Sequence, residues 1–454
     1  MVSDKSIVEK TVSIGRLTVE GGRGLQGTVR ISGFKHALVS LFAAACSTES
    51  SVVIHNCPAI AETETLIQLI QCSGGSASWE GDSLSINASG IKHGRLDPSV
   101  SNRIHGSAYL APALVTRTGE AVIGVRGGCP IGDGLHGNRP VEHYVSIFEK
   151  FGAQARVDDT GNLHIKGKQL VGCDIDLLDF TSDRTLETGP LYSGASKMAL
   201  PTAAVASGPS TLYNLYPKPD VTELVAFLRQ LGVKIDGNST HRLVVYGRGG
   251  VGVTSHVSYT LIGDLIEIVT WICAGAMLEN SQLRIQGVGL ARALEALHPE
   301  MSVISQMGVP IEWDGETLVV RSMDRGHAVD MVVTSPGIYS DNHPFLALLA
   351  TACCGQSRIT EKVWQNRFDY VQGLVSLGAR IHREGASAVI HGETRPHIAG
   401  RNLRANDVRS AAVLLLAALT IDGTTTIEGT HHLARGYIDF VSTLRELGAK
   451  IDVE

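Results

Sequence analysis

One cysteine of this chain stands in a segment that cannot pack around it. The segment GGCPIGDGLHGNRPVEHY, residues 127–144, places Cys129 among several glycines, two histidines and an arginine. A structural cysteine behaves as a small buried hydrophobe, whereas glycine-rich chain is mobile and offers no side chains for packing. The segment therefore predicts either a simple series of turns or a moving loop whose thiol meets a ligand.

A metal site is a second interpretation of the same segment. Cys129, His136 and His143 follow one another at intervals of seven residues. These intervals do not match the usual ligand spacings of zinc sites, so we predict no metal. The scattered glycines form neither a GxGxxG turn between strand and helix nor a P-loop, and we predict no cofactor.

Composition limits the class of protein. The chain has 454 residues, of which 43% are hydrophobic and 19% charged, and this is typical of a globular protein with two large or three small domains. A net charge of −6 argues against a nucleic-acid partner. The polar N-terminus, the short apolar runs and eight scattered cysteines predict a cytoplasmic protein with reduced thiols and no membrane segment. No obligate protein partner is evident from the sequence.

An internal repeat provides the elements that must position these residues. Six helix endings run up to a glycine and then into an alternating strand, at intervals of 70 to 80 residues. A glycine in this position suits the left-handed C-cap of a helix. The six glycines are Gly74, Gly152, Gly232, Gly308, Gly378 and Gly448. Between the endings lies an Ala/Leu-rich helix, which gives a strand–helix–strand–helix–strand unit of about 75 residues.

Six units exceed one core of ordinary size, so we expect three in each of two domains. The sixth unit ends at Glu454 almost without its last strand, and the alternating segment 13–21 could replace it. The predicted domains are residues 21–258, which carry the cysteine loop, and residues 259–454 together with 1–20.

The order of several motifs then points to a family. The chain contains SGFKHA (32–37), GGCPIG (127–132), RPVEHY (139–144), NRF (366–368), DVRSAA (407–412) and ARGY (434–437). Together with the six repeats, these motifs resemble the enolpyruvyl transferases along nearly the whole chain. The resemblance implies an α/β fold of two inside-out α/β barrels with the active site in the cleft between them. It implies an enzyme that moves the enolpyruvyl group of phosphoenolpyruvate onto an alcohol and releases phosphate.

Phosphoenolpyruvate is a small trianion, so its site needs several cations. The matching positions provide Lys35, Arg103, Arg139, Arg367, Arg409 and Arg435. The resemblance gives Lys35 and Arg435 catalytic roles as well.

Two further groups must move protons. By resemblance, Cys129 protonates C3 of phosphoenolpyruvate, and neighbouring arginines would favour its reactive thiolate. Asp341 in YSDNHP (339–344) matches the aspartate beside the acceptor hydroxyl and is a candidate general base. Its alternative role is to cap a helix beginning near His343.

Three departures from the family pattern concern the acceptor. His36 replaces the asparagine that follows the lysine, and the loop between Cys129 and Arg139 is five residues longer and includes His136. In PLYSGASKM (190–198), Pro190 replaces the lysine of the segment that holds nucleotide phosphates, and Lys197 appears instead.

Other parts of the acceptor segments keep the family pattern. The Ser193–Gly194 turn is retained, and so are Arg139, Pro140 and Val141 of the uracil segment, with Glu142 in place of an aspartate. We therefore predict a uridine acceptor without the diphosphate-linked sugar. The preferred acceptor is UMP, attacked through its 3′-hydroxyl, as in the enzymes of nikkomycin- and polyoxin-type antibiotic biosynthesis. The alternative acceptor is UDP-N-acetylglucosamine, which is used in peptidoglycan synthesis.

Two alternative functions are a shikimate-pathway enolpyruvyl transferase and a scaffold without catalysis. The shikimate-pathway enolpyruvyl transferases share fold and donor but lack the loop cysteine, so Cys129 argues against that activity. A repeat scaffold without catalysis would not need Lys35, Cys129, Asp341 and Arg435 together.

Overall fold

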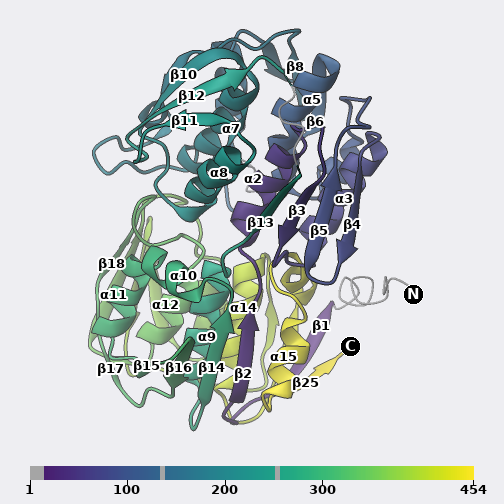
Figure 1. Ribbon diagram of the computed structural model, residues 1–454. Coiled ribbons are helices and arrows are strands. Elements are labelled where there is room, and N and C mark those ends of the chain that lie inside the picture. Colours follow the sequence, from purple (N-terminus) through teal and green to yellow (C-terminus); the bar gives the residue numbers. More distant parts are fainter. Residues whose placement is uncertain (1–14, 133–138, 251–255) are drawn as a thin grey trace. The chain divides into compact units, whose positions relative to one another are not determined.

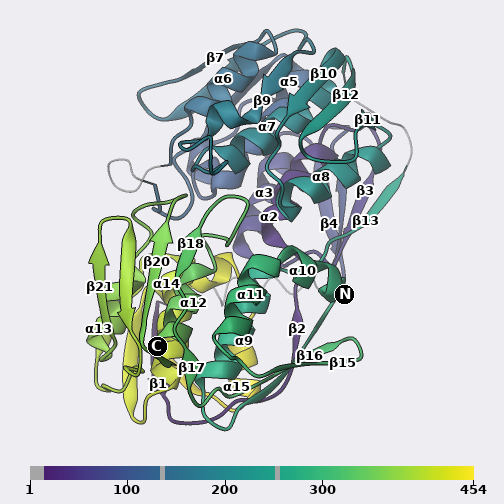
Figure 2. The same cartoon turned by 90° about the vertical axis from the view of Figure 1, so that its left-hand side faces the viewer.

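The structure, a computed structural model, describes residues 15–132, 139–250 and 256–454. The chain divides into two compact units, which are drawn in Figure 1 and, from a second side, in Figure 2. One unit is formed by the chain up to Gly33 together with Ile262–Glu454, and the other by Phe34–Leu261. They are called the terminal unit and the central unit below.

The six predicted helix endings are confirmed by backbone geometry. The glycines at positions 74, 152, 232, 308, 378 and 448 all have positive φ angles, between 76° and 111°. Each follows a helix and precedes a strand, because glycine adopts the left-handed conformation without steric cost. The helices are α3 (Ala61–Cys72), α6 (Glu142–Lys150), α8 (Pro219–Gln230), α11 (His298–Gln306), α13 (Tyr370–Ser376) and α15 (Phe440–Glu446).

The described part of the central unit contains three sheets. Their strand orders are β13-β3-β5-β4, β6-β8-β7 and β9-β10-β12-β11. The first contains β13 (Val257–Thr260), β3 (Val52–His55), β5 (Ser83–Asn87) and β4 (Ser76–Glu80). The second contains β6 (Glu120–Gly124), β8 (Asn162–Lys166) and β7 (Gln154–Val157). The third contains β9 (Asp174–Asp176), β10 (Ser207–Tyr213), β12 (Arg242–Arg248) and β11 (Lys234–Asp236).

The described part of the terminal unit repeats this pattern in three four-stranded sheets. The first has β2 (Gln26–Ile31), β14 (Gln282–Gly287), β16 (Thr317–Arg321) and β15 (Ile311–Asp314). The second has β18 (Met331–Val333), β20 (Gln356–Glu361), β22 (Ser387–His391) and β21 (Arg380–Glu384). The third has β23 (Asn402–Arg404), β24 (Thr424–Glu428), β1 (Arg16–Glu20) and β25 (Lys450–Val453). A small additional pair is β17 (Gly326–His327) and β19 (Cys353–Cys354).

Helices form the interior of each unit. In the terminal unit, α9 (Leu265–Met277), α12 (His343–Ala350) and α14 (Val408–Leu419) contact one another, and every residue in them is buried. A helix that is apolar all round must be enclosed on all sides. The sheets cover these helices and alternate buried with exposed residues, as β24 does. Helices inside and sheets outside are the inside-out α/β arrangement that the sequence predicts, built here from separate sheets.

The central unit has the same arrangement of helices. Its nearly fully buried helices α2 (Lys35–Ala45) and α7 (Tyr192–Val205) both pack against α8, and α5 (Ala111–Thr118) packs against α7. The shorter helices of the two units are α4 (Pro98–Ser101), η1 (His105–Leu110), η3 (Leu177–Phe180), α10 (Leu290–Ala296) and η4 (Thr430–Arg435).

The strands next to the two points where the chain passes from one unit to the other show that the predicted domain boundaries are wrong. As predicted, β1 completes the last sheet by pairing with both β24 and β25. However, β2 pairs in parallel with β14, so residues 21–33 belong with the terminal unit and not with the cysteine loop. β13 pairs in parallel with β3 and therefore ends the central unit at Leu261. The boundaries follow these pairings and lie at 33/34 and 261/262.

Among the described residues, no helix is long and apolar enough to cross a membrane.

Candidate active site

Lys35 and His36 open helix α2 of the central unit. The Lys35 ammonium lies 3.4 Å from the carboxylate of Glu62 on α3, and both side chains are only about one-tenth exposed (11% and 12%). His36 is partly exposed, with its ring centroid 5.4 Å from that of Phe34. The fold thus holds a lysine charge near the surface at a helix start, with one carboxylate against it.

Cys129 follows the end of β6 in a tight turn. Its carbonyl accepts a hydrogen bond from the Ile131 N–H at 2.9 Å, and its side chain is half-buried. A Cβ atom added at Gly128 would lie 3.8 Å from the guanidinium carbon of Arg139. The structure therefore brings the backbone beside Cys129 close to Arg139. His136 and most of the predicted insertion lie outside the described residues.

Arg103 is not brought to this turn by the contacts that it makes. It is exposed, and its guanidinium donates to the Ser99 carbonyl at 3.2 Å and to the Gln68 side chain at 3.3 Å. These partners lie on α4 and α3. Arg103 thus lies at the surface of the central unit, where it contacts α3 and α4.

The segment after Arg139 leads into helix α6. Pro140 and Val141 are half-buried, and Glu142 is the exposed first residue of the helix. His143 and Tyr144 are buried, and burial, reinforced by the charge of Lys197, lowers the pKa of His143 to about 3. The imidazole of His143 is therefore neutral at physiological pH.

The Ser193–Gly194 turn approaches this segment very closely. A Cβ atom at Gly194 would lie 2.6 Å from Nε2 of His143, so glycine leaves the space that the His143 ring occupies against the start of α7. Ser193 Oγ donates to Asp220 at 2.9 Å, and the Lys197 ammonium lies 3.2 Å from the same carboxylate oxygen. Both acceptor segments predicted from the sequence thus meet in one place in the central unit.

An aromatic cluster of His105, Tyr109 and Tyr144, which the sequence does not predict, lies beside these two segments. The Tyr144 hydroxyl lies 3.0 Å from Nε2 of His105 and 3.5 Å from the Tyr109 hydroxyl, and the Lys197 ammonium lies 5.3 Å from the Tyr109 ring centroid. Burial lowers the pKa of His105 well below its usual value, and the positive charge of Arg139 lowers it further. His105 and Tyr109 are spaced by four residues, which is ordinary for a core helix, and no motif marks them.

Asp341 in the terminal unit is held by two arginines. Its Oδ1 forms an ion pair with Arg367, and its Oδ2 accepts from Nη2 and Nε of Arg409 at 3.0 and 3.2 Å. Only 13% of the Asp341 side chain is exposed, against 8% and 4% for the two arginines. Asp341, Arg367 and Arg409, which lie far apart in the sequence, therefore form one triad.

The structure excludes one of the two roles considered for Asp341. The N-cap residue of α12 is Asn342, and no side chain caps this helix. The capping interpretation of Asp341 is therefore wrong, because its carboxylate is turned to the arginines instead.

Arg435 and Tyr437 extend the group around Arg409. The Tyr437 hydroxyl accepts from Nη1 of Arg409 at 3.0 Å, and the ion pair with Asp341 contributes to a raised pKa of Arg409 despite its burial. Arg435, two residues earlier at the end of η4, is partly exposed. Arg409 is thus a permanently charged group with a fixed orientation, and a second arginine lies close in sequence.

These two groups of residues can be compared with those of known proteins. Residues 19–444 match the family of EPSP synthase, 3-phosphoshikimate 1-carboxyvinyltransferase. This match covers most of the chain. The chain belongs to this family of enolpyruvyl transferases.

Curated relatives of this enolpyruvyl transferase extend over its whole length. It is 30% identical over 440 residues to UDP-N-acetylglucosamine 1-carboxyvinyltransferase 2 of Caldanaerobacter subterraneus, a match covering 96% of the chain and 99% of the relative. It is also 30% identical over 459 residues to UDP-N-acetylglucosamine 1-carboxyvinyltransferase of Synechocystis, covering 99% and 97%.

Solved structures show the same fold. The crystal structure of the enolpyruvyl transferase NikO from Streptomyces tendae is 40% identical to this enolpyruvyl transferase, with a TM-score of 0.91 over 97% of this chain and 99% of NikO. EPSP synthase from Acinetobacter baumannii is 18% identical with a TM-score of 0.72 over 97% of this chain and 100% of that chain, which is a likeness of fold alone.

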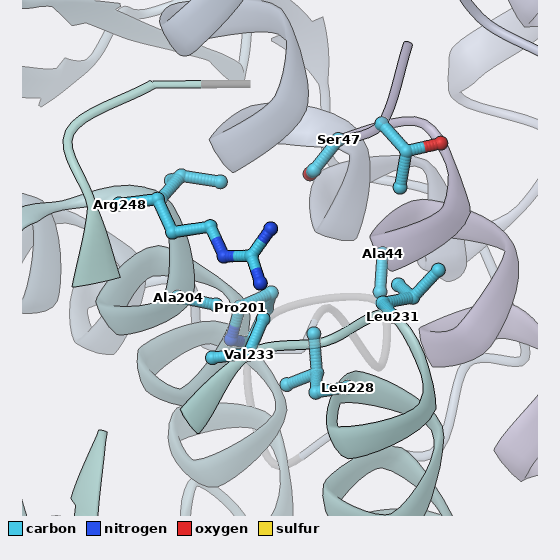
Figure 3. A pocket seen from close by; sticks show the side chains of 10 residues that line it. Ala44, Ser47, Pro201, Ala204, Leu228, Leu231, Val233 and Arg248 are labelled. Carbon is cyan, nitrogen blue, oxygen red and sulfur yellow. The ribbon is translucent and has the colours of Figure 1, made fainter. Parts of the chain in front are cut away.

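One small pocket of the enolpyruvyl transferase lies away from the predicted residues. It is lined by the C-terminal parts of α2, α7 and α8, with Arg248 of β12 at its edge (Figure 3). Lys35 and Ser193 stand at the opposite, N-terminal ends of α2 and α7. This apolar pocket therefore belongs to a different part of the central unit.

In the described part of the enolpyruvyl transferase, no group of three or more His, Cys, Asp or Glu residues is arranged to hold a metal ion.

Proposed function

We propose that this enolpyruvyl transferase moves the enolpyruvyl group of phosphoenolpyruvate onto a hydroxyl of a uridine nucleotide, with release of phosphate. The preferred acceptor is UMP, attacked through its 3′-hydroxyl, in a nikkomycin-type antibiotic route. The observation that carries this choice is the 40% identity to NikO, against 28–31% for the UDP-N-acetylglucosamine transferases.

The acceptor segments support a smaller nucleotide. Pro190 provides no charge where the family pattern has lysine, and Lys197 is one helical turn beyond the Ser193–Gly194 turn, paired with Asp220. Together with the positive start of helix α7, Lys197 would suit a single phosphate group of the acceptor. Pro140, Val141 and Glu142 would contact the uracil, and His36 would contact the ribose side of the acceptor.

The donor requires the cationic residues. Lys35, Arg139 and Arg435 are proposed to bind phosphoenolpyruvate, with Arg367 and Arg409 on its carboxylate side and Arg103 as a more distant cation. These groups would stabilise the negative charge that develops during addition and elimination.

Two residues are proposed to move the protons. The acceptor oxygen attacks C2 as Asp341 takes its proton, and C3 receives a proton from Cys129, which gives a tetrahedral intermediate. Loss of phosphate and of one C3 proton then gives the enol ether. Because Arg367 and Arg409 both hold the Asp341 carboxylate, an anionic donor that binds to these arginines would free this carboxylate to accept the proton. The base would thus become active only after the donor has bound.

The second candidate acceptor is UDP-N-acetylglucosamine, because the curated relatives carry this name at full length. Purified protein should be incubated with phosphoenolpyruvate and either UMP or UDP-N-acetylglucosamine, and phosphate release should be measured. We expect turnover with UMP. Turnover with the UDP-sugar alone would replace UMP by the second candidate.

A further inference from the structure

The segment that carries Asp341 is held from two sides by buried carboxylates. Oε1 of Glu300, on α11, accepts the Tyr339 N–H at 2.6 Å and the Asn342 side-chain amide at 3.0 Å. Oε2 of Glu361, at the end of β20, accepts the Ser340 hydroxyl at 2.7 Å. Both glutamates are completely buried. The residues immediately before and after Asp341 are therefore held by two different buried acids.

Glu361 also holds a second segment, residues 363–364, whereas the hydrogen bonds of Glu300 given above reach only the segment of Asp341. Its Oε1 accepts the N–H groups of Val363 at 2.7 Å and Trp364 at 3.0 Å. The Trp364 carbonyl in turn accepts the N–H of Arg367 at 3.0 Å. One carboxylate therefore connects the segment of Asp341, through Oε2, with the turn that leads to Arg367, through Oε1.

Such a carboxylate is costly to keep in a protein core. Burial raises the pKa of Glu361 to about 7, and the nearest imidazole, Nε2 of His343 at 3.4 Å, belongs to a histidine whose pKa is lowered to about 3 by burial. Its direct partners are neutral donors, and a purely structural link would be made at lower cost by uncharged groups. The carboxylate offers two acceptor oxygens in one rigid group, so it can hold both segments at once.

We propose that Glu361 is a positioning residue for enolpyruvyl transfer, because it sets Asp341 and Arg367 at the distance from each other that the reaction requires. This inference rests on the roles proposed above for Asp341 as base and Arg367 as a ligand of the donor. Glu300 positions only the Asp341 side. The two glutamates should therefore differ in their kinetic effects.

The test compares Glu361→Gln and Ser340→Ala with the matched control Ser357→Ala in the full chain. Ser357 is a buried serine on the same strand, and its hydroxyl accepts the Val329 N–H at 3.0 Å. Because displacements of about 1 Å can cost a hundredfold in rate, we expect Glu361→Gln to lower kcat by about tenfold to a hundredfold. It should also raise the KM for phosphoenolpyruvate several-fold, and Ser340→Ala should give a smaller change in the same direction.

Further variants distinguish positioning from general loss of structure. Ser357→Ala should keep kcat within about twofold while lowering Tm to a similar extent as Ser340→Ala. Glu300→Gln should lower kcat without raising the KM for phosphoenolpyruvate. If Glu361→Gln keeps both constants within about twofold while Asp341→Asn loses activity, the positioning role is wrong and the proposed function stands. If Asp341→Asn itself stays active, the proposed role of Asp341 fails first.

Discussion

At the scale of single residues, the ion pairs among Asp341, Arg367 and Arg409 add to the roles that the sequence assigns to each of them. The sequence indicates one base and two donor-binding cations by family position alone. The structure pairs them, with Arg409 donating twice to one oxygen of Asp341. If the anionic donor binds to these arginines as proposed, it competes with Asp341 for them. The pairing could not be predicted, since Arg409 lies in a different repeat from Asp341 and Arg367 and no local pattern links the three residues.

This pairing leads to a prediction for Asp341→Asn. The amide cannot accept the proton of the acceptor hydroxyl, so kcat should fall by about a hundredfold or more. The arginines lose their internal anion and should bind the donor at least as tightly, so the KM for phosphoenolpyruvate should stay equal or decrease. Steady-state kinetics at saturating acceptor would measure both constants. A rise in this KM with unchanged kcat would contradict the roles proposed for the triad.

The thiol of Cys129 leads to a second prediction. Cys129→Ser should lose turnover, because a hydroxyl is too weak an acid to protonate C3. Cys129→Asp should retain activity and become insensitive to the epoxide fosfomycin, which needs a thiol to alkylate. The assay is phosphate release with and without preincubation with fosfomycin.

Cys173 provides the matched control for these variants. It is also half-buried in the central unit, but burial raises its pKa to about 11, so it should be unreactive. Cys173→Ser should keep both activity and fosfomycin inhibition. Full inhibition of Cys129→Asp by fosfomycin would mean that another thiol is the target.

At the scale of elements, local sequence pattern predicts where helices end and strands begin, whereas long-range contacts decide which strands pair and where the two units divide. The six glycines end their helices as predicted because a positive φ is a local demand. The partners of β2 and β13 depend on distant strands, so both boundaries were placed too early. The cluster of His105, Tyr109 and Tyr144 was missed for the same reason, as its members share no motif.

The contact between α7 and α6 leads to a prediction for Gly194→Ala. Alanine favours a helix by up to about 1 kcal/mol over glycine, but its Cβ would meet Nε2 of His143 at 2.6 Å. His143 must then move, and with it the preceding segment that is proposed to bind the uracil. We expect the KM for the acceptor to rise about tenfold and the KM for phosphoenolpyruvate to change little.

Gly152→Ala is the control for this substitution. Gly152 has a φ of 84° and open space at its Cβ position, so alanine should cost about 1 kcal/mol in backbone strain without altering acceptor binding. Measuring Tm and both KM values for the two variants separates stability from recognition. Equal effects of both variants on the acceptor KM would show that the Gly194–His143 contact does not shape the acceptor site.

At the scale of the whole molecule, buried titratable groups make the stability depend on pH in two opposite ways. Burial raises the pKa of Glu267 and of Glu361 to about 7, so protonated forms stabilise the fold at low pH and this contribution is lost as the pH rises from about 4.5 to 7. Burial lowers the pKa of His143 and of His343 to about 3, so their contribution is complete above pH 6.5 and is lost as the pH falls toward 3. The two trends oppose each other between about pH 4.5 and 6.5.

Glu267 allows one of these trends to be removed by itself. Its carboxylate accepts the N–H and the hydroxyl of Ser32 at 3.0 and 2.6 Å, bonds that tie the first chain crossing to helix α9. In Glu267→Gln the side chain no longer ionises, so raising the pH from 5.5 to 8 no longer costs the roughly 2 kcal/mol that 1.5 pKa units represent. Relative to the parent, the variant should therefore gain several degrees in Tm over this interval.

Glu384→Gln is the control, because this exposed carboxyl has a lowered pKa and is ionised throughout the interval. Parallel Tm curves for Glu267→Gln and the parent would show that Glu267 is already ionised at pH 5.5, and the opposing trend would then rest on Glu361 alone.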